Sequence, residues 1–245
     1  MKLAVIACRV FTRDISLAAA KSENICELFW LDQGLHTTPA VLAETLKKTI
    51  TEIEERQAAL PEHRKYDAIV LGYGLCSNGI IGAGSAVLPV VAPRCDDCIA
   101  LFLGSQARYL ELFHAHPGLY WYNPNWIEQS DPSCPASFER NYALYAEMYG
   151  EDNAEFLIEA DRSWVKNYRA AGYIHSPVHE NESYIEFTRQ TAIDFGWEFI
   201  EFEGSSDYIT RLLKGGWNGE DFLVCPAGQM ICESFDCTKI KNCDI

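Results

Sequence analysis

Short apolar runs alternate with longer amphipathic stretches along most of the chain. Continuous apolar runs are typical of strands buried on both faces of a parallel sheet, and amphipathic stretches are typical of the helices that cover it. Eight runs are predicted as strands, at residues 3–8, 26–32, 67–74, 88–94, 119–123, 172–176, 198–203 and 222–225. The alternation therefore predicts strand–helix–strand units around a mostly parallel sheet.

The clearest helix pattern covers residues 39–60. A proline near its start fits the first helical turn, and apolar residues then recur at three- and four-residue spacings, at Leu42, Leu46, Ile50 and Ile53. A second helix, residues 96–116, begins with two aspartates, one of which is predicted as its N-cap. Further helices are predicted at residues 137–149, 153–171, 181–195 and 205–214.

Prolines and polar residues concentrate at residues 123–138, directly after the fifth predicted strand. This is typical of a domain boundary, or equally of one long active-site loop. We expect a single α/β domain over residues 1–245, with a mostly parallel, Rossmann-like sheet flanked by helices, rather than two independent domains. Residues 125–172 are interpreted as a helical insertion or lid within it.

The composition narrows the class of protein. Apolar residues make up 48% of the chain, which excludes a disordered protein. A formal net charge of −15 argues against a nucleic-acid partner, because phosphate backbones require clustered Lys and Arg. No apolar run reaches the ~20 residues of a membrane span, and too few residues precede Cys8 for a secretory signal. We therefore expect a soluble, cytoplasmic protein with reduced thiols and no membrane partner.

Cysteines follow several of the predicted strands. Cys8 ends the first strand, Cys76 follows the third, and Cys98 begins the helix after the fourth. Cys225 ends the last strand, so the fold should gather at least some of these thiols at one sheet edge, where parallel sheets bind ligands. Neighbouring thiolates repel one another unless a cation compensates them, so a gathered set implies a metal. The alternative is that each cysteine is a small apolar core residue.

Two histidines and one aspartate could complete such a site. His36 lies between the second strand and the next helix, where a neutral imidazole would complete a Cys₃His shell for zinc. His175 also ends a strand, and with Asp97 it is a candidate catalytic residue. The simpler interpretations are a loop or capping role for His36 and a helix N-cap role for one of the two aspartates, Asp96 or Asp97. Cys26, inside a strand, and Cys134, in a loop between prolines, are expected to lie outside the site.

The turn "LGYGLCSNG", residues 71–79, places glycines around Cys76. Glycines allow a close approach of the backbone to a ligand, so Gly72, Gly74 and Gly79 are candidates for cofactor binding. The turn lacks the lysine of a phosphate-binding P-loop and the third glycine of a dinucleotide fingerprint. The alternative is a tight turn around an inert thiol.

The C-terminal segment holds four more candidate thiols, at Cys225, Cys232, Cys237 and Cys243. Their spacings match no ferredoxin pattern. They are interpreted either as a second metal site or, for the last three, as free thiols on a mobile terminus.

Four segments resemble the motif series of the DUF1638 family. Cys8 ends the first strand, and three further motifs follow, "LHTTPAVLAETL", "GYGLCSNG" and "PRCDDCIALFLGS". The resemblance covers most of the first half of the chain. It implies that Cys8, His36, Cys76 and Cys98 act together as metal ligands, and that the protein accompanies corrinoid-dependent methyltransferase systems of anaerobes.

The expected function is that of a metal-binding protein, with zinc as the first choice of metal and a [4Fe–4S] cluster as its rival. One hypothesis is an enzyme of methyl or one-carbon transfer to a thiol, with a small-molecule substrate or a corrinoid protein as its partner. Others are a non-catalytic metal- or corrinoid-binding accessory protein of a methyltransferase system, and a structural metal site. An open coordination position on the metal would favour the enzyme hypothesis. A closed shell of four protein ligands would favour a structural site.

Overall fold

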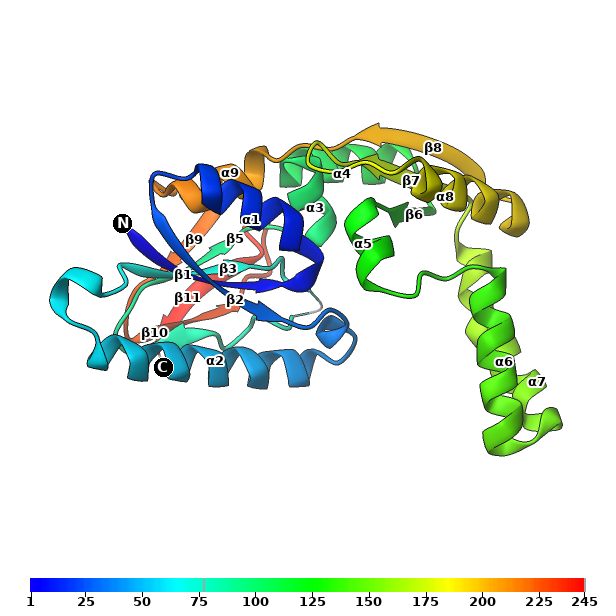
Figure 1. Ribbon diagram of the computed structural model, residues 1–245, viewed down its shortest axis with the longest axis horizontal. Helices are drawn as coiled ribbons and strands as arrows, with labels where there is room; N and C mark the ends of the chain where they lie inside the picture. The colour runs from blue at the N-terminus through cyan, green and yellow to red at the C-terminus, as the bar shows by residue number, and fades with distance from the viewer. Residues whose placement is uncertain (77, 245) are drawn as a thin grey trace. The chain divides into compact units, whose positions relative to one another are not determined.

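The computed structural model describes residues 1–76 and 78–244, and the chain divides into two compact units (Figure 1). The first combines Met1–Tyr109 with Ser205–Ile245, and the second is the continuous segment Leu110–Gly204. The predicted insertion, residues 125–172, falls inside the second unit, which also contains strands. The units are described separately below.

The central sheet of the first unit has the strand order β2-β1-β3-β5-β9. Its strands are β1 (Lys2–Cys8), β2 (Ile25–Leu31), β3 (Ala68–Gly72), β5 (Val90–Pro93) and β9 (Phe222–Cys225). The first four run parallel, and β9 pairs with β5 in the antiparallel direction. The expected mixed α/β fold with a mostly parallel sheet flanked by helices is therefore confirmed.

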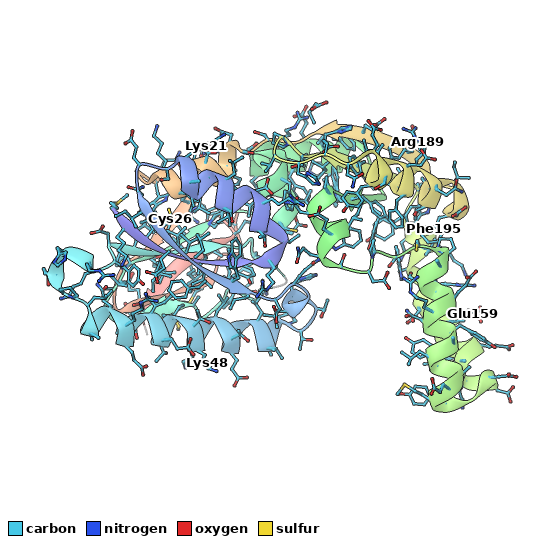
Figure 2. All side chains as sticks on the ribbon, in the orientation of Figure 1. Lys21, Cys26, Lys48, Glu159, Arg189 and Phe195 are labelled. Atoms are coloured by element: carbon cyan, nitrogen blue, oxygen red, sulfur yellow. A yellow bond between two sulfur atoms is a disulfide. The ribbon has the colours of Figure 1, made fainter. Side chains whose placement is uncertain are left out.

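Burial on both faces explains the unbroken apolar runs of the inner strands. Val5 in β1, Ile69 in β3 and Val91 in β5 are fully buried. Two helices, α1 (Thr12–Lys21) and α9 (Asp207–Lys214), lie on one face of the sheet, and α2 (Pro39–Ala59) lies on the other (Figure 1). On α2 the apolar positions face the sheet, whereas Lys48 points away from it (Figure 2).

The connecting helices differ from the sequence-based expectations at three places. Helix α1 was not predicted, because it is short and leaves the strand after only the 3₁₀ turn η1 (Arg9–Phe11). The predicted helix 96–116 is two helices, α3 (Cys98–Leu103) and α4 (Gln106–Ala115), since Gly104 adopts a left-handed conformation between them. Two more 3₁₀ turns, η2 (Leu35–Thr37) and η3 (Glu62–Arg64), flank α2.

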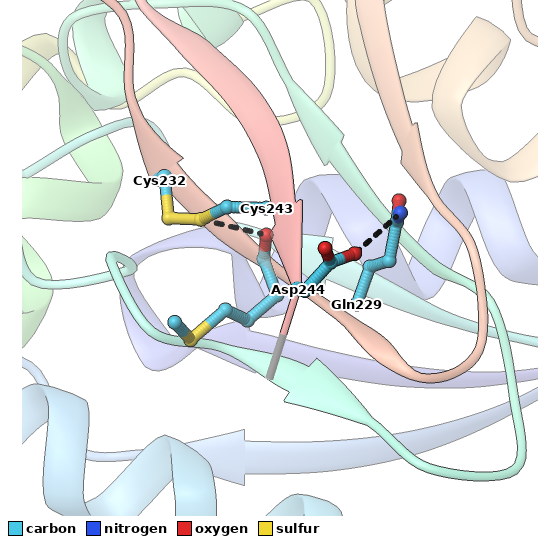
Figure 3. Close-up of a disulfide and its surroundings, with 5 residues drawn as sticks. Gln229, Cys232, Cys243 and Asp244 are labelled. Carbon is cyan, nitrogen blue, oxygen red and sulfur yellow. Dashed lines mark hydrogen bonds between the residues drawn. A yellow bond between two sulfur atoms is a disulfide. The ribbon is translucent and has the colours of Figure 1, made fainter.

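A three-stranded antiparallel sheet, ordered β11-β10-β4, completes the first unit. It consists of β4 (Gly84–Ser85), β10 (Gln229–Glu233) and β11 (Ile240–Asp244), and none of the three was predicted. A disulfide joins Cys232 to Cys243 across the hairpin β10–β11 (Figure 3). The expectation of free thiols on a mobile terminus is therefore wrong for these two cysteines, because both lie in paired strands, with Cys232 opposite Lys241 and Cys243 opposite Met230.

The second unit contains a parallel sheet of β6 (Leu119–Tyr122), β7 (Ala170–His175) and β8 (Glu198–Glu203), with β7 in the middle. Its helices are α5 (Pro124–Gln129), α6 (Pro135–Tyr149), α7 (Glu151–Arg162) and α8 (Glu182–Phe195). The predicted helix 153–171 ends at Arg162, and the 3₁₀ turn η4 (Ser163–Asn167) follows it. No helix in the described part of the chain is long and apolar enough to cross a membrane.

Aromatic side chains form the core of the second unit. Tyr122, Tyr173 and Trp197 are buried, and Tyr120 packs among them with its ring 5.0 Å from that of Trp164. Packing of the unit's own core therefore accounts for these aromatic side chains.

Candidate thiol site at the carboxyl edge of the sheet

Strand register brings the first residues of the site together. In the β1–β3 pair Ala7 lies opposite Gly72, so Cys8 and Tyr73 are the next residues on the two strands. In the β1–β2 pair Cys8 lies opposite Leu31, and Asp32 follows. The carboxyl ends of three neighbouring strands therefore place a thiol, a phenol and a carboxylate at one edge, as parallel sheets do at their ligand sites.

The glycine turn after β3 is held against the loop that precedes α3. The backbone N–H of Leu75 donates to Cys95 O at 2.9 Å, and that of Cys76 donates to Asp96 O at 3.0 Å. Gly74 makes this approach feasible, because a Cβ there would lie 2.7 Å from the Cα of Asp97. Cys76 itself adopts a left-handed conformation, with φ 47°, which is uncommon outside glycine and costs energy.

The thiols of Cys8, Cys76 and Cys98 interact electrostatically. Burial raises the pKa of Cys76 to about 12, and the charges of Asp97 and Cys8 contribute to that rise. Burial also raises the pKa of Cys98, with Asp97, Cys76 and Cys8 as further causes. Because each ionised group disfavours the next, the three thiols share one neighbourhood and remain protonated at neutral pH unless a cation stabilises their thiolates.

Asp97 is the N-cap of α3, so of the two aspartates, Asp96 and Asp97, it is the one that takes the predicted N-cap role. Its Oδ1 accepts a hydrogen bond from the backbone N–H of Ile99 at 2.8 Å, and its side chain also bonds Tyr109. Burial raises the pKa of Asp97 despite these bonds. Its neighbour Asp96 forms an ion pair with Lys239, 2.9 Å from Nζ to Oδ1.

Tyr73 was not identified from the sequence. Its side chain is only 3% exposed, and its hydroxyl has no hydrogen-bond partner among the described residues. Burial raises the pKa of Tyr73, and the charges of Cys8, Cys76 and Asp32 raise it further, so the hydroxyl stays protonated. One feature of the sequence could have pointed to Tyr73, namely its place inside the glycine turn, between Gly72 and Gly74.

His36 lies in η2, at the same edge of the sheet, after β2. Burial lowers the pKa of His36, which favours the neutral imidazole that a metal requires. Among the described residues, no hydrogen bond joins His36 to the three cysteines. Across residues 1–76 and 78–244, no group of three or more His, Cys, Asp or Glu side chains is arranged to hold a metal ion as it stands.

The three candidate cofactor-binding glycines are each close to protein atoms. A Cβ on Gly72 would lie 2.7 Å from Ala7 Cβ, and one on Gly79 would lie 2.5 Å from Leu42 Cδ2. Gly74 faces the backbone of Asp97, as described above. Packing of the chain on itself is therefore a sufficient reason for glycine at all three positions.

Cys225 is the one of the four strand-end cysteines, of which at least some were expected to gather, that lies away from this edge. It does end β9, but β9 is antiparallel and pairs Cys225 with Val90, the first residue of β5. Cys26 pairs with Leu3 near the start of the sheet, which agrees with its expected place inside a strand. Cys134 is the N-cap residue of α6 in the second unit.

His175, the second catalytic candidate, belongs to the second unit. Its Nδ1 lies 3.2 Å from Glu180 Oε2, and its Nε2 lies 3.2 Å from Glu201 Oε1. Both carboxylates are in the same unit as His175, so both ring nitrogens already have partners there.

The fold and this edge define a mixed α/β protein whose parallel sheet carries a cluster of thiols at its carboxyl end. The chain belongs to the family described as "Protein of unknown function (DUF1638)", whose model matches residues 30–213. The match includes His36, Cys76 and Cys98, and Cys8 precedes it. No curated protein and no solved structure matches the chain.

Proposed function

We propose that the protein binds a thiophilic metal ion, zinc in the first instance, through Cys8, Cys76 and Cys98, with His36 as a candidate fourth ligand. The observation that supports this most directly is that Cys8 raises the pKa of Cys76, and that both raise the pKa of Cys98, although the three thiols come from separate segments. A cation is the group that would relieve this repulsion, and sulfur ligands suit zinc. Binding requires the thiols to lose protons and their side chains to close around the ion.

The strand order β2-β1-β3-β5 supports the finer proposal of a Rossmann-like sheet, in which a ligand lies beyond the carboxyl ends of the strands. Residues 125–172 hold three helices and are proposed as the lid of such a protein. A [4Fe–4S] cluster uses the same three thiolates and is the alternative occupant.

The proposed reaction is transfer of a methyl group from a corrinoid to a small-molecule thiol. Bound zinc would lower the pKa of a substrate thiol at an open position. The thiol proton leaves to solvent, the sulfur–carbon bond forms, and the cobalt–carbon bond breaks with its electron pair remaining on cobalt. The chain would position the thiol, and the corrinoid context rests on the family resemblance.

Metal content tests the site. Protein purified without oxygen is analysed for zinc, iron and sulfide, and by ultraviolet–visible spectroscopy. We expect one zinc per chain in the wild type and in Cys26→Ser, and loss of zinc in Cys76→Ser. Cys26 is the matched control, because it is also a free cysteine of the first unit but lies in β2. Equal metal content in both variants refutes the proposed ligands, and brown protein with iron and sulfide selects the cluster.

Activity tests the reaction separately. Zinc-loaded protein is mixed with methylcobalamin and 2-mercaptoethanol, and demethylation is followed by absorbance. The enzyme hypothesis requires faster demethylation than with Cys76→Ser. Bound zinc without any acceleration would favour the non-catalytic accessory protein. His36→Ala then tests the role of His36: loss of zinc would support a ligand, whereas retained zinc with slower demethylation would support a contact with substrate.

A further inference from the structure

The outer edge of strand β2 has no strand beside it among the described residues. β2 is the first strand in the order β2-β1-β3-β5-β9, and within the described chain it pairs with β1 alone. The opposite edge of the sheet is shorter and partly covered, because β9 has four residues and Asn242 of β11 donates a hydrogen bond to Val224 O at 3.4 Å. The edge of β2 is therefore the long, open one, and natural proteins rarely leave such an edge unprotected.

The backbone of β2 turns every second residue towards this edge. The N–H of Ile25 donates to Met1 O at 2.9 Å, so the odd-numbered residues of β2 bond to the β1 side. The N–H and C=O groups of Cys26, Leu28 and Trp30 therefore point the other way, and no backbone hydrogen bond to them is found among the described residues. The three residues thus present a row of strong hydrogen-bonding groups, one donor and one acceptor each.

The side chains of β2 do nothing to block pairing at this edge. The strand contains no proline, lysine or arginine, which are the residues that commonly protect an edge. Its single charged residue, Glu27, is already paired with Arg56 and Lys2. Ile25 is 67% exposed, and the next five residues are all partly exposed. An apolar edge without an unpaired charge is complementary to another apolar, uncharged strand.

We propose that this strand is β2 of a second copy of the chain, paired in the antiparallel direction about a two-fold axis at Leu28. In this register the two Leu28 residues exchange N–H···O bonds, and Cys26 exchanges them with Trp30 of the second copy. Every outward-pointing backbone group of β2 is then bonded, and the two central sheets become one. Glu27 lies opposite Phe29 of the second copy, so like charges do not face each other. The interface does not depend on the proposed function.

The edge is large enough for a stable dimer. Its seven residues, at about 3.4 Å each, give a length of roughly 24 Å. Helices α1 and α2 lie on the two faces of the sheet, so the edge is three layers deep (Figure 1). With about 10 Å per layer it presents roughly 700 Å² per copy, close to the ~800 Å² per partner of a standard interface.

The first arm of the test measures the mass in solution by sedimentation and light scattering. Leu28→Pro removes one outward N–H and leaves the β1 ladder intact, because this N–H does not point towards β1. The matched control, Leu28→Val, keeps the N–H and an apolar side chain. We expect a wild-type dimer, a dissociation constant raised at least about 100-fold by Leu28→Pro, and one within about threefold of wild type for Leu28→Val.

The second arm uses disulfide cross-linking and does not need the proline variant to fold. Leu28→Cys places two new thiols opposite each other, with Cα atoms about 5.5 Å apart, which suits a disulfide. Ile25→Cys is the control, because Ile25 is exposed but would lie opposite Leu31 of the second copy, about 20 Å along the strand from its own counterpart. After mild oxidation, peptide mass spectrometry should find the two introduced thiols joined in Leu28→Cys and not in Ile25→Cys.

Three outcomes overturn the proposal. A wild type that stays monomeric at about 100 μM leaves the edge to a different chain. A dimer of equal stability in wild type and in a folded Leu28→Pro variant uses another surface. If circular dichroism shows that Leu28→Pro does not fold, the cross-link decides, and equal linking of Leu28→Cys and Ile25→Cys, or of neither, rejects the two-fold axis at Leu28.

Discussion

Gly74 shows how one missing side chain allows two loops to meet. Its backbone lies against that of Asp97, and any Cβ at residue 74 would come within 2.7 Å of backbone atoms that cannot rotate away. We expect Gly74→Ala to lower the free energy of unfolding by about 1–3 kcal/mol, because the two loops must separate. Urea unfolding measures this loss.

Gly219→Ala is the matched control for this variant. A Cβ at Gly219 would have no atom within 4 Å, and the residue does not need a left-handed conformation. We expect its stability to be unchanged or slightly increased, since alanine restricts the unfolded chain. A similar loss in both variants would contradict the role of the Gly74–Asp97 contact.

The cysteines should also differ in reactivity. Burial raises the pKa values of the Cys76 and Cys98 thiols, so little thiolate exists at pH 8, whereas Cys237 is exposed. In metal-free protein we expect iodoacetamide to modify Cys237 more than about 100-fold faster than Cys76 or Cys98. Timed labelling and peptide mass spectrometry measure the rates. Rapid modification of Cys76 would contradict its assigned environment.

At the scale of elements, Glu27 joins four segments of the first unit. From β2 its carboxylate lies 2.6 Å from Arg56 Nη2 of α2 and 3.5 Å from Lys2 Nζ of β1. It also accepts a hydrogen bond of 2.6 Å from the hydroxyl of Tyr66, which precedes β3. Burial raises the pKa of Glu27, but the Tyr66 bond and the two cations outweigh burial and lower it.

A lowered pKa in the folded state makes this stabilisation depend on pH. The contribution is complete above the unfolded value, roughly 4.3, and is lost as the pH falls through the folded pKa. We expect Glu27→Gln to cost about 1 kcal/mol at pH 7 and progressively less at pH 4 and below. Glu55→Gln, on the exposed side of α2, is the control. A pH-independent loss would contradict the assigned network.

The Cys232–Cys243 disulfide should stabilise the C-terminal hairpin. The two cysteines are 11 residues apart, and closure of a loop of this size is worth about 3 kcal/mol in the chain-entropy description. The double variant Cys232→Ser with Cys243→Ser should lose about this amount. Hydrogen exchange should accelerate at the amides of Gly82 and Ile231, which bond across β4–β10. Unchanged exchange after reduction would contradict this prediction.

The element scale also shows what the sequence can predict. The inner strands were predictable, because burial on both faces leaves unbroken apolar runs. The direction of β9 was not predictable, since an apolar run such as "FLVC" is the same in either direction, and the edge at which Cys225 lies was therefore not predictable either. Tyr73 could not be identified from the sequence, because only the three-dimensional packing shows that its hydroxyl is buried without a hydrogen-bond partner among the described residues. An N-cap at one of the two aspartates before α3 was predictable from the local sequence, but only the structure shows that it is Asp97.

At the scale of the whole molecule, a metal that binds only the folded chain must raise its stability. A free concentration of 100 times the dissociation constant contributes about 2.7 kcal/mol. We expect added zinc to raise the unfolding temperature of the wild type, chelation to reverse the rise, and Cys76→Ser to abolish it. Increased hydrogen-exchange protection confined to the second unit would contradict a site in the first.

The contact between the glycine turn and the last strands sets an order of events during protein synthesis. Asn78 donates a hydrogen bond to Glu233, which lies 155 residues further along the chain. Asp96, beside the other loop of the site, pairs with Lys239. A ribosome therefore releases both thiol-bearing loops long before β10 and Lys239 emerge, and we expect the loops to reach their final arrangement only after these residues have been synthesised. A chain truncated before β10 should carry cysteines that remain open to modification, however well its central sheet has formed.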